Sequence, residues 1–219
     1  TVARGNARWS RDGGSIYHTT DQGSEFRRLA RLDLASGRLE VLTPSLTWDV
    51  QQFELSPDGR QIALVTNEAG QSRLSLLTLP GGRLRPVPNL PVGLIGGLEW
   101  RPQGGELGFT LSTARSAADV YSLEVARGRL IRWTESETGG LDVSALPEPE
   151  LVRWKSFDGL EISGFLYRPP ARFTGPRPVL ISIHGGPEGQ STPGFLGRTN
   201  YFLLELGAAV LLPNVRGST

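Results

Sequence analysis

The sequence predicts a partial β-propeller of about three blades, followed by a linker and the first part of an α/β domain with a parallel sheet. Three observations predict this order. Turn motifs recur at a fixed period through residues 1–134, Gly and Pro residues interrupt the pattern over 135–150, and apolar strand-like runs surround a helix-like segment over 151–219.

Two markers repeat through residues 1–134. The turns at 9–13, 55–59 and 100–104 are separated by 46 and then 45 positions, and Gly-Arg-Leu triplets at 37–39, 82–84 and 128–130 keep the same period. Asp followed by Gly suits a turn between antiparallel strands. Short strand-forming runs lie between the turns, at 16–20, 62–65, 74–77 and 120–125. Four strands fit into one period of about 45 residues, which is typical of a propeller blade.

A β-sandwich also has short strands at short intervals, but the fixed period of both markers favours the propeller. Propellers close with about four to eight blades, so we expect further blades before Thr1. Methionine is absent from the chain, and the sequence ends inside a motif discussed below. We therefore expect a piece of a longer protein that is truncated at both ends.

The predicted linker, residues 135–150, contains two adjacent glycines and two prolines, and it marks a domain boundary. Beyond it, the runs 151–157 and 161–167 flank Asp158-Gly159, which predicts a hairpin with a two-residue turn. The apolar run 179–183 predicts a buried parallel strand covered by helices on both faces. Residues 201–206 predict a short helix, and 208–212 predict another strand.

The composition limits the class of protein. The chain has 219 residues, 38% of them hydrophobic, and 23 basic against 22 acidic residues give a formal net charge of +1. We therefore expect no nucleic-acid partner. No apolar run approaches the roughly 20 residues that span a bilayer, so we expect no membrane association. Cysteine is absent and histidine occurs twice, so we expect no disulfide, metal or cofactor, which fits a cytoplasmic location.

A Gly-rich loop follows the predicted strand 179–183, beginning with His184, Gly185 and Gly186. Glycines allow the chain to turn sharply and to bring bare N–H groups close to a ligand, as in an oxyanion hole. The other interpretation is a tight strand-to-helix turn without a ligand, and the tetrapeptide alone fits both.

The motif His-Gly-Gly-Pro at 184–187, followed by Asn-Val-Arg-Gly-Ser at 214–218, resembles the start of the catalytic domain in the prolyl oligopeptidase family of serine peptidases. The resemblance is strongest to its acylaminoacyl-peptidase and dipeptidyl-peptidase branches. It implies an α/β-hydrolase fold for 151–219, acyl-enzyme chemistry on short peptides, and an oxyanion donor at the N–H of Gly186. Gly185 and His184 would then shape the loop, and Arg216 is a candidate for substrate binding or for fixing a loop.

The nucleophile, acid and base of such an enzyme are not expected within this chain. It has no Gly-x-Ser-x-Gly motif, and Ser218 precedes the strand that would carry the nucleophile. His184 stands too early in the order serine, acid, histidine to be the base. We expect His18 to be an ordinary half-exposed residue of a strand. The 219-residue piece alone is therefore predicted to be inactive.

Two alternatives remain open at this point. An esterase or lipase could share the hydrolase start, and a non-catalytic propeller could serve as an interaction module. The expected partners are a short peptide and the remainder of the same chain, and a homo-oligomer is possible.

Overall fold

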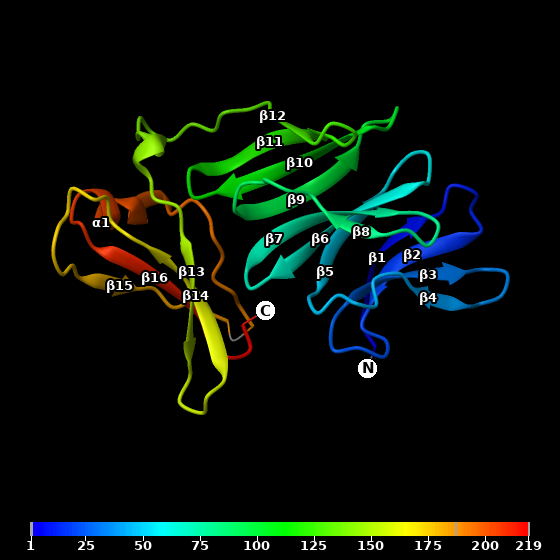
Figure 1. The fold of residues 1–219 in the computed structure, drawn as a ribbon, viewed down its shortest axis with the longest axis horizontal. Helices are drawn as coiled ribbons and strands as arrows, with labels where there is room; N and C mark the ends of the chain where they lie inside the picture. The colour runs from blue at the N-terminus through cyan, green and yellow to red at the C-terminus, as the bar shows by residue number, and fades with distance from the viewer. Residues whose placement is uncertain (1, 187, 219) are drawn as a thin grey trace.

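The structure, a computed structural model, describes residues 2–186 and 188–218, which form four four-stranded sheets (Figure 1). The first three sheets, which we call blades 1 to 3, are antiparallel and pair strands in sequence order. Blade 1 contains β1 (Arg4–Trp9), β2 (Ser15–Thr20), β3 (Arg28–Asp33) and β4 (Leu39–Val41). Blade 2 contains β5 (Val50–Leu55), β6 (Gln61–Glu68), β7 (Gln71–Thr78) and β8 (Leu84–Pro86). Blade 3 contains β9 (Gly93–Trp100), β10 (Glu106–Thr113), β11 (Ser116–Glu124) and β12 (Arg129–Arg132).

The repeated turn motif occupies the same place in each blade, between its first and second strands. In each turn the glycine N–H donates to the carbonyl three residues earlier, at 3.0 Å for Gly13, 2.8 Å for Gly59 and 2.7 Å for Gly104. All three glycines have a φ between +71° and +74°, which side chains rarely adopt. The prediction of consecutive four-stranded units with equivalent turns is confirmed, and the architecture is propeller-like.

Neighbouring blades are joined at their first strands. Arg8 of β1 pairs with Glu54 of β5 at 2.8 Å, and the indole N–H of Trp100 in β9 donates to the Glu54 carbonyl at 3.1 Å. Between blades 1 and 2 the buried apolar side chains include Tyr17, Phe53 and Leu64; a second cluster joins blades 2 and 3. His18 is 8% exposed, so the expectation of a half-exposed histidine was wrong: its strand β2 is almost wholly covered within this packing.

The fourth sheet is mixed and lies beside blade 3 in Figure 1. It contains β13 (Glu150–Lys155), β14 (Glu161–Tyr167), β15 (Val179–Ile181) and β16 (Ala209–Asn214), in the order β13-β14-β16-β15. Among the strand pairs of this sheet within the described residues, β15 and β16 are parallel and the others are antiparallel. The helical segments are the 3-10 turns Val143–Ala145 and Gly197–Thr199 and the helix α1 (Asn200–Leu204). None of the helices in the described part of the chain is long and apolar enough to cross a lipid bilayer.

Two expectations for the fourth sheet were wrong in detail. The strand predicted at 179–183 ends at Ile181, and its Val179 and Ile181 side chains are 54% and 58% exposed, because no helices cover both its faces within the described residues. The hairpin between β13 and β14 has a longer loop than two residues, since Lys155 pairs with Glu161. Its Gly159 has a φ of +83° and follows the same turn pattern as the blades.

The tips of blades 2 and 3 pack against the fourth sheet. Ala114, in the turn between β10 and β11, is buried among Phe165, Tyr167, Leu203 and Val210. The Arg115 guanidinium donates to the Leu146 carbonyl at 3.0 Å, so the segment before β13 is also held to blade 3. These contacts give the loops after β15 and β16 a defined position relative to the blades.

Candidate active-site loop

The loop after β15 requires glycine at position 186 but not at 185. Gly186 has a φ of +138°, and a Cβ there would lie 2.6 Å from the Gly189 nitrogen and 2.7 Å from the Glu188 nitrogen. A Cβ on Gly185 would meet no atom of residues 2–186 and 188–218 within 4 Å. Both glycines are exposed, so their N–H groups are near the surface; Pro187, the last residue of the motif, lies outside the described residues. The sequence identified this Gly-rich turn. The structure adds that a side chain is sterically excluded at position 186 and not at position 185.

His184 connects the loop after β15 to the loop after β16. Its Nε2 lies 2.8 Å from the Ser218 hydroxyl oxygen, and its Nδ1 lies 2.9 Å from the Gly185 carbonyl oxygen. With the proton on Nδ1, the ring donates to Gly185 and accepts from the Ser218 hydroxyl. Both ring nitrogens are thus engaged in bonds that hold loops together.

Asn214, at the end of β16, fixes the far end of the same loop. Its side-chain oxygen accepts from the Ser191 N–H at 2.7 Å, and its amide nitrogen donates to the Ser191 carbonyl at 3.0 Å. Both residues are buried. Sequence reasoning included Asn214 in a motif without giving it a role, and this two-bond contact with Ser191 has no local sequence signal.

Tyr167 holds the segment that follows Ser191, at Gly194. Its hydroxyl donates to the Gly194 carbonyl at 3.0 Å and accepts from the Gly194 N–H at 3.1 Å. Burial raises the pKa of Tyr167 to about 12, so the hydroxyl keeps its proton at neutral pH and can make both bonds.

Arg216 is paired with a residue of the β13–β14 hairpin. Its guanidinium lies 2.5 Å from the Asp158 carboxylate and 5.7 Å from the ring centroid of Phe157, whose side chain is almost fully exposed. The hydrogen bond from Arg216 lowers the pKa of Asp158. Asp158, which the sequence predicts as a turn residue, is therefore also paired with Arg216, 58 positions away in the chain.

A cavity of about 490 Å³ lies between the blades and this loop. Gln190 and Ser218 line it on one side, and residues of blades 1 and 2 line it on the other: Glu25, Phe26, Arg27, Trp48, Asp49, Gln51 and Asn67. Arg27 and Asp49 are bonded to each other at 3.1 Å. Sequence reasoning missed the blade residues, because they come from loops and strand ends of blades 1 and 2 that are far apart in the sequence.

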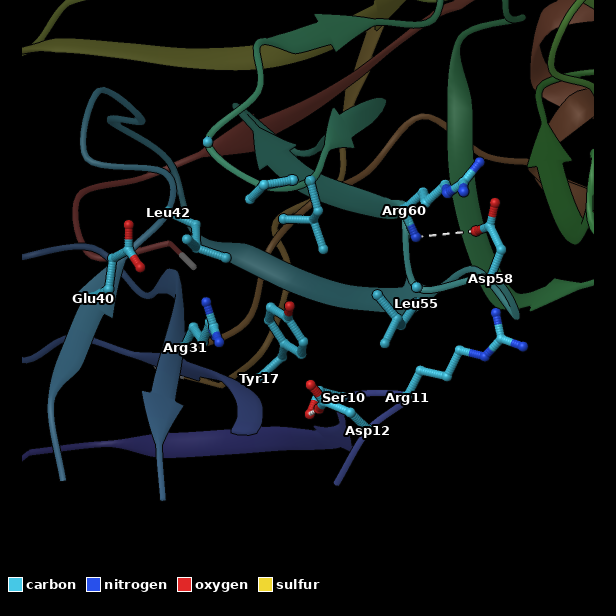
Figure 2. A pocket seen from close by; sticks show the side chains of 14 residues that line it. Ser10, Arg11, Asp12, Tyr17, Arg31, Glu40, Leu42, Leu55, Asp58 and Arg60 are labelled. Carbon is cyan, nitrogen blue, oxygen red and sulfur yellow. Dashed lines mark hydrogen bonds between the residues drawn. The ribbon is translucent and has the colours of Figure 1, made fainter. Parts of the chain in front are cut away.

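A second cavity, of about 570 Å³, lies between the turns of blades 1 and 2, and the described residues that line it belong to these two blades (Figure 2). Two of the three carboxylates that line it, Asp12 and Asp58, serve the turns: each accepts from the serine two residues before it and from a backbone N–H two residues after it. The serine hydrogen bonds lower the pKa values of both aspartates. These carboxylates are turn-forming groups, and neither is arranged as a proton donor.

Comparisons with known proteins found no matching family model and no matching curated protein. Solved structures match well. A puromycin hydrolase is 26% identical, with a TM-score of 0.79, and the match covers all of this chain and 34% of that protein. Prolyl oligopeptidase B from Galerina marginata is 18% identical, with a TM-score of 0.82, and the match covers all of this chain and 31% of that protein.

A puromycin-hydrolyzing peptidase from Mycobacterium tuberculosis is 19% identical, with a TM-score of 0.82, over all of this chain and 35% of that protein. This chain thus spans about a third of the length of these structures. The two matches below 25% identity show the fold alone. Together the matches show that this chain has the fold of one part of these proteins.

Proposed function

We propose that this chain is part of a serine peptidase of the prolyl oligopeptidase family that hydrolyses short peptides through an acyl-enzyme. Residues 1–134 would be propeller blades, 135–150 a linker, and 151–219 the beginning of the α/β-hydrolase domain. The parallel pair β15–β16 and the structural matches support this division. The exposure of β1 along its whole length fits a further blade packed against blade 1.

The N–H of Gly186 would donate to the oxyanion that forms when the nucleophile attacks the peptide carbonyl. The observation that carries this proposal is the geometry of Gly186: its φ of +138° and the lack of space for a Cβ hold an exposed backbone group in one orientation. Such donors stabilise the developing charge without reorganising during the reaction. The nucleophile, acid and base would come from the remainder of the protein.

The cavity between blades and loop is the proposed place for the peptide. Trp48 and Phe26 offer aromatic surface there, and Ser218 connects the cavity to His184. Enclosure between two parts of the protein would admit short peptides and exclude folded proteins. An acylaminoacyl- or dipeptidyl-peptidase activity is the finer form of this proposal.

Replacing Gly186 in the full-length protein tests the assignment. Gly186→Ala should lower kcat for a peptide by about 100- to 1,000-fold, as the loss of one oxyanion donor typically does. Gly185→Ala is the matched control and should cost much less, because a Cβ there contacts none of the residues that the structure describes. Equal losses in the two variants would refute the role of Gly186. Turnover of activated esters without peptides would identify an esterase, and absence of both would favour an interaction module.

A further inference from the structure

We propose that the tip of the β6–β7 hairpin, residues 67–70 of blade 2, positions the loop that carries Gly186, with Asn67 as the positioning residue. This inference rests on the proposed function for its catalytic consequence, and the contact itself stands on the geometry. The hairpin belongs to the propeller-like part of the chain, and the loop belongs to the fourth sheet. The proposal therefore assigns blade 2 a role in the proposed reaction beyond enclosing the cavity.

Gly70 brings the hairpin into direct contact with the fourth sheet. A Cβ at this position would lie 2.8 Å from the Ser191 carbonyl oxygen and 3.0 Å from the Phe165 ring, and Gly70 has a φ of +88°. Phe165 is fully buried in the core of the fourth sheet. Only a residue without a side chain fits, so the backbone of the hairpin sets its distance from the loop.

Asn67 adds a directional bond to this contact. Its amide nitrogen donates to the Gln190 side-chain oxygen at 2.7 Å, across 123 positions of sequence. The other end of the Asn67 amide accepts from the Gly70 N–H at 2.9 Å, and the Asn67 backbone N–H donates to the Asp49 carbonyl at 3.1 Å. The Asn67 side chain is thus held in place before it contacts Gln190.

The position of Gln190 affects Gly186 through the close contacts of its neighbour Gly189. The backbone packs so closely there that a Cβ on Gly189 would lie 2.3 Å from the Gly185 carbonyl oxygen and 3.0 Å from the His184 ring. The Gly189 nitrogen in turn occupies the space beside Gly186. Since Asn214 fixes Ser191, a displacement of Gln190 cannot be accommodated by a movement of Ser191. It shifts Gly189 instead, and with it residues 184–186.

A charge cycle in the full-length protein tests the contact with nearly isosteric changes. Asn67→Asp alone leaves a carboxylate that the Gln190 amide can donate to, and Gln190→Glu alone leaves a carboxylate that Asn67 can donate to. The double variant N67D/Q190E places two carboxylates against each other with no donor between them. Each single variant is therefore the matched control for the charge that it introduces.

Asn67 and Gln190 also line the cavity proposed for the peptide, so the effect of each single variant on kcat for a small activated ester is measured first and serves as the baseline for the double variant. The double variant should lose about tenfold more than the product of the single effects, in kcat and not in KM. A merely structural contact would instead lower the melting temperature of the double variant and leave its kcat unchanged at temperatures below melting. Additive effects, or a loss confined to KM, would overturn the proposal.

Amide hydrogen exchange of residues 188–191 provides a readout that needs no enzymatic activity. Exchange should accelerate in the double variant and not in either single variant, because only the double variant releases the loop from the hairpin. If the wild-type protein hydrolyses neither esters nor peptides but exchange follows this pattern, the proposed function fails while the positioning contact stands. Unchanged exchange in the double variant would refute the contact.

Discussion

Asp119 of β11 holds the end of blade 3 together, and its removal should destabilise the protein by about 2 kcal/mol at neutral pH. Its side chain is fully buried and accepts hydrogen bonds from Ser116, from Arg132 at 2.6 Å, from Thr134 at 2.9 Å and from the Ser136 N–H at 2.8 Å. These partners belong to β11, to β12 and to the segment after β12, so one carboxylate ties three stretches of chain.

The magnitude follows from the pKa. Burial would raise the pKa of Asp119, but hydrogen bonds from Ser116, Arg132, Thr134 and Ser136 outweigh it and lower the pKa from 3.8 to about 2. The ionised form is therefore stabilised on folding by about 2 kcal/mol, at about 1.4 kcal/mol per pKa unit. This contribution is present above pH 4 and is lost as the pH falls from about 4 to 2.

The assay is urea unfolding of wild type and Asp119→Asn at pH 7 and at pH 2. The difference in unfolding free energy should be about 2 kcal/mol at pH 7 and should shrink strongly at pH 2, where the wild-type carboxylate is losing its charge. Asp12→Asn, at an exposed turn, is the control and should show a smaller difference. A difference between wild type and Asp119→Asn that stays constant with pH would refute the ionic account of this network.

Two further predictions concern the loops after β15 and β16. His184→Ala removes the bonds to Gly185 and Ser218, so kcat of the full-length protein should fall by about tenfold, which is less than the loss expected for an oxyanion donor. The pH profile of kcat should be unchanged. Loss of an ionisation from that profile would contradict the loop-holding role of His184. Arg216→Gln removes an exposed pair with Asp158, so the melting temperature should hardly change, and a large drop in thermal melting would contradict this weak contribution.

The blades could be predicted because each is specified by local signals. A turn that ends in Gly, preceded by Asp in the first two blades and by Gln103 in the third, marks where one strand ends and the next begins, and its recurrence every 45 or 46 residues marks the repeated unit. The Gly-rich turn after the apolar run was also recognisable, but the tetrapeptide alone did not distinguish an oxyanion donor from a tight turn without a ligand. The burial of β15 was predicted wrongly, because an apolar run indicates that a strand can be buried but does not show which element packs against it.

The supports of the candidate site could not be predicted from the sequence. Asn67 and Gly70 read as an ordinary turn between two strands, and their contacts with Gln190 and Ser191 cross more than 120 positions. Hydrogen-bonding side chains such as Asn214 have many possible partners, and no periodic pattern selects one of them. Only the packing of the fourth sheet against the blade tips determines these pairs.

The pairing of strands with their sequence neighbours in blades 1 to 3 has a consequence for how the chain acquires its structure. Each blade closes only short loops, whereas the β14–β16 pair and the Asn67–Gln190 bond must wait until distant segments meet. Contacts of low sequence separation form at a smaller entropic cost and therefore earlier. The blades can thus order during synthesis and present a preformed surface on which the Gly186 loop is assembled last.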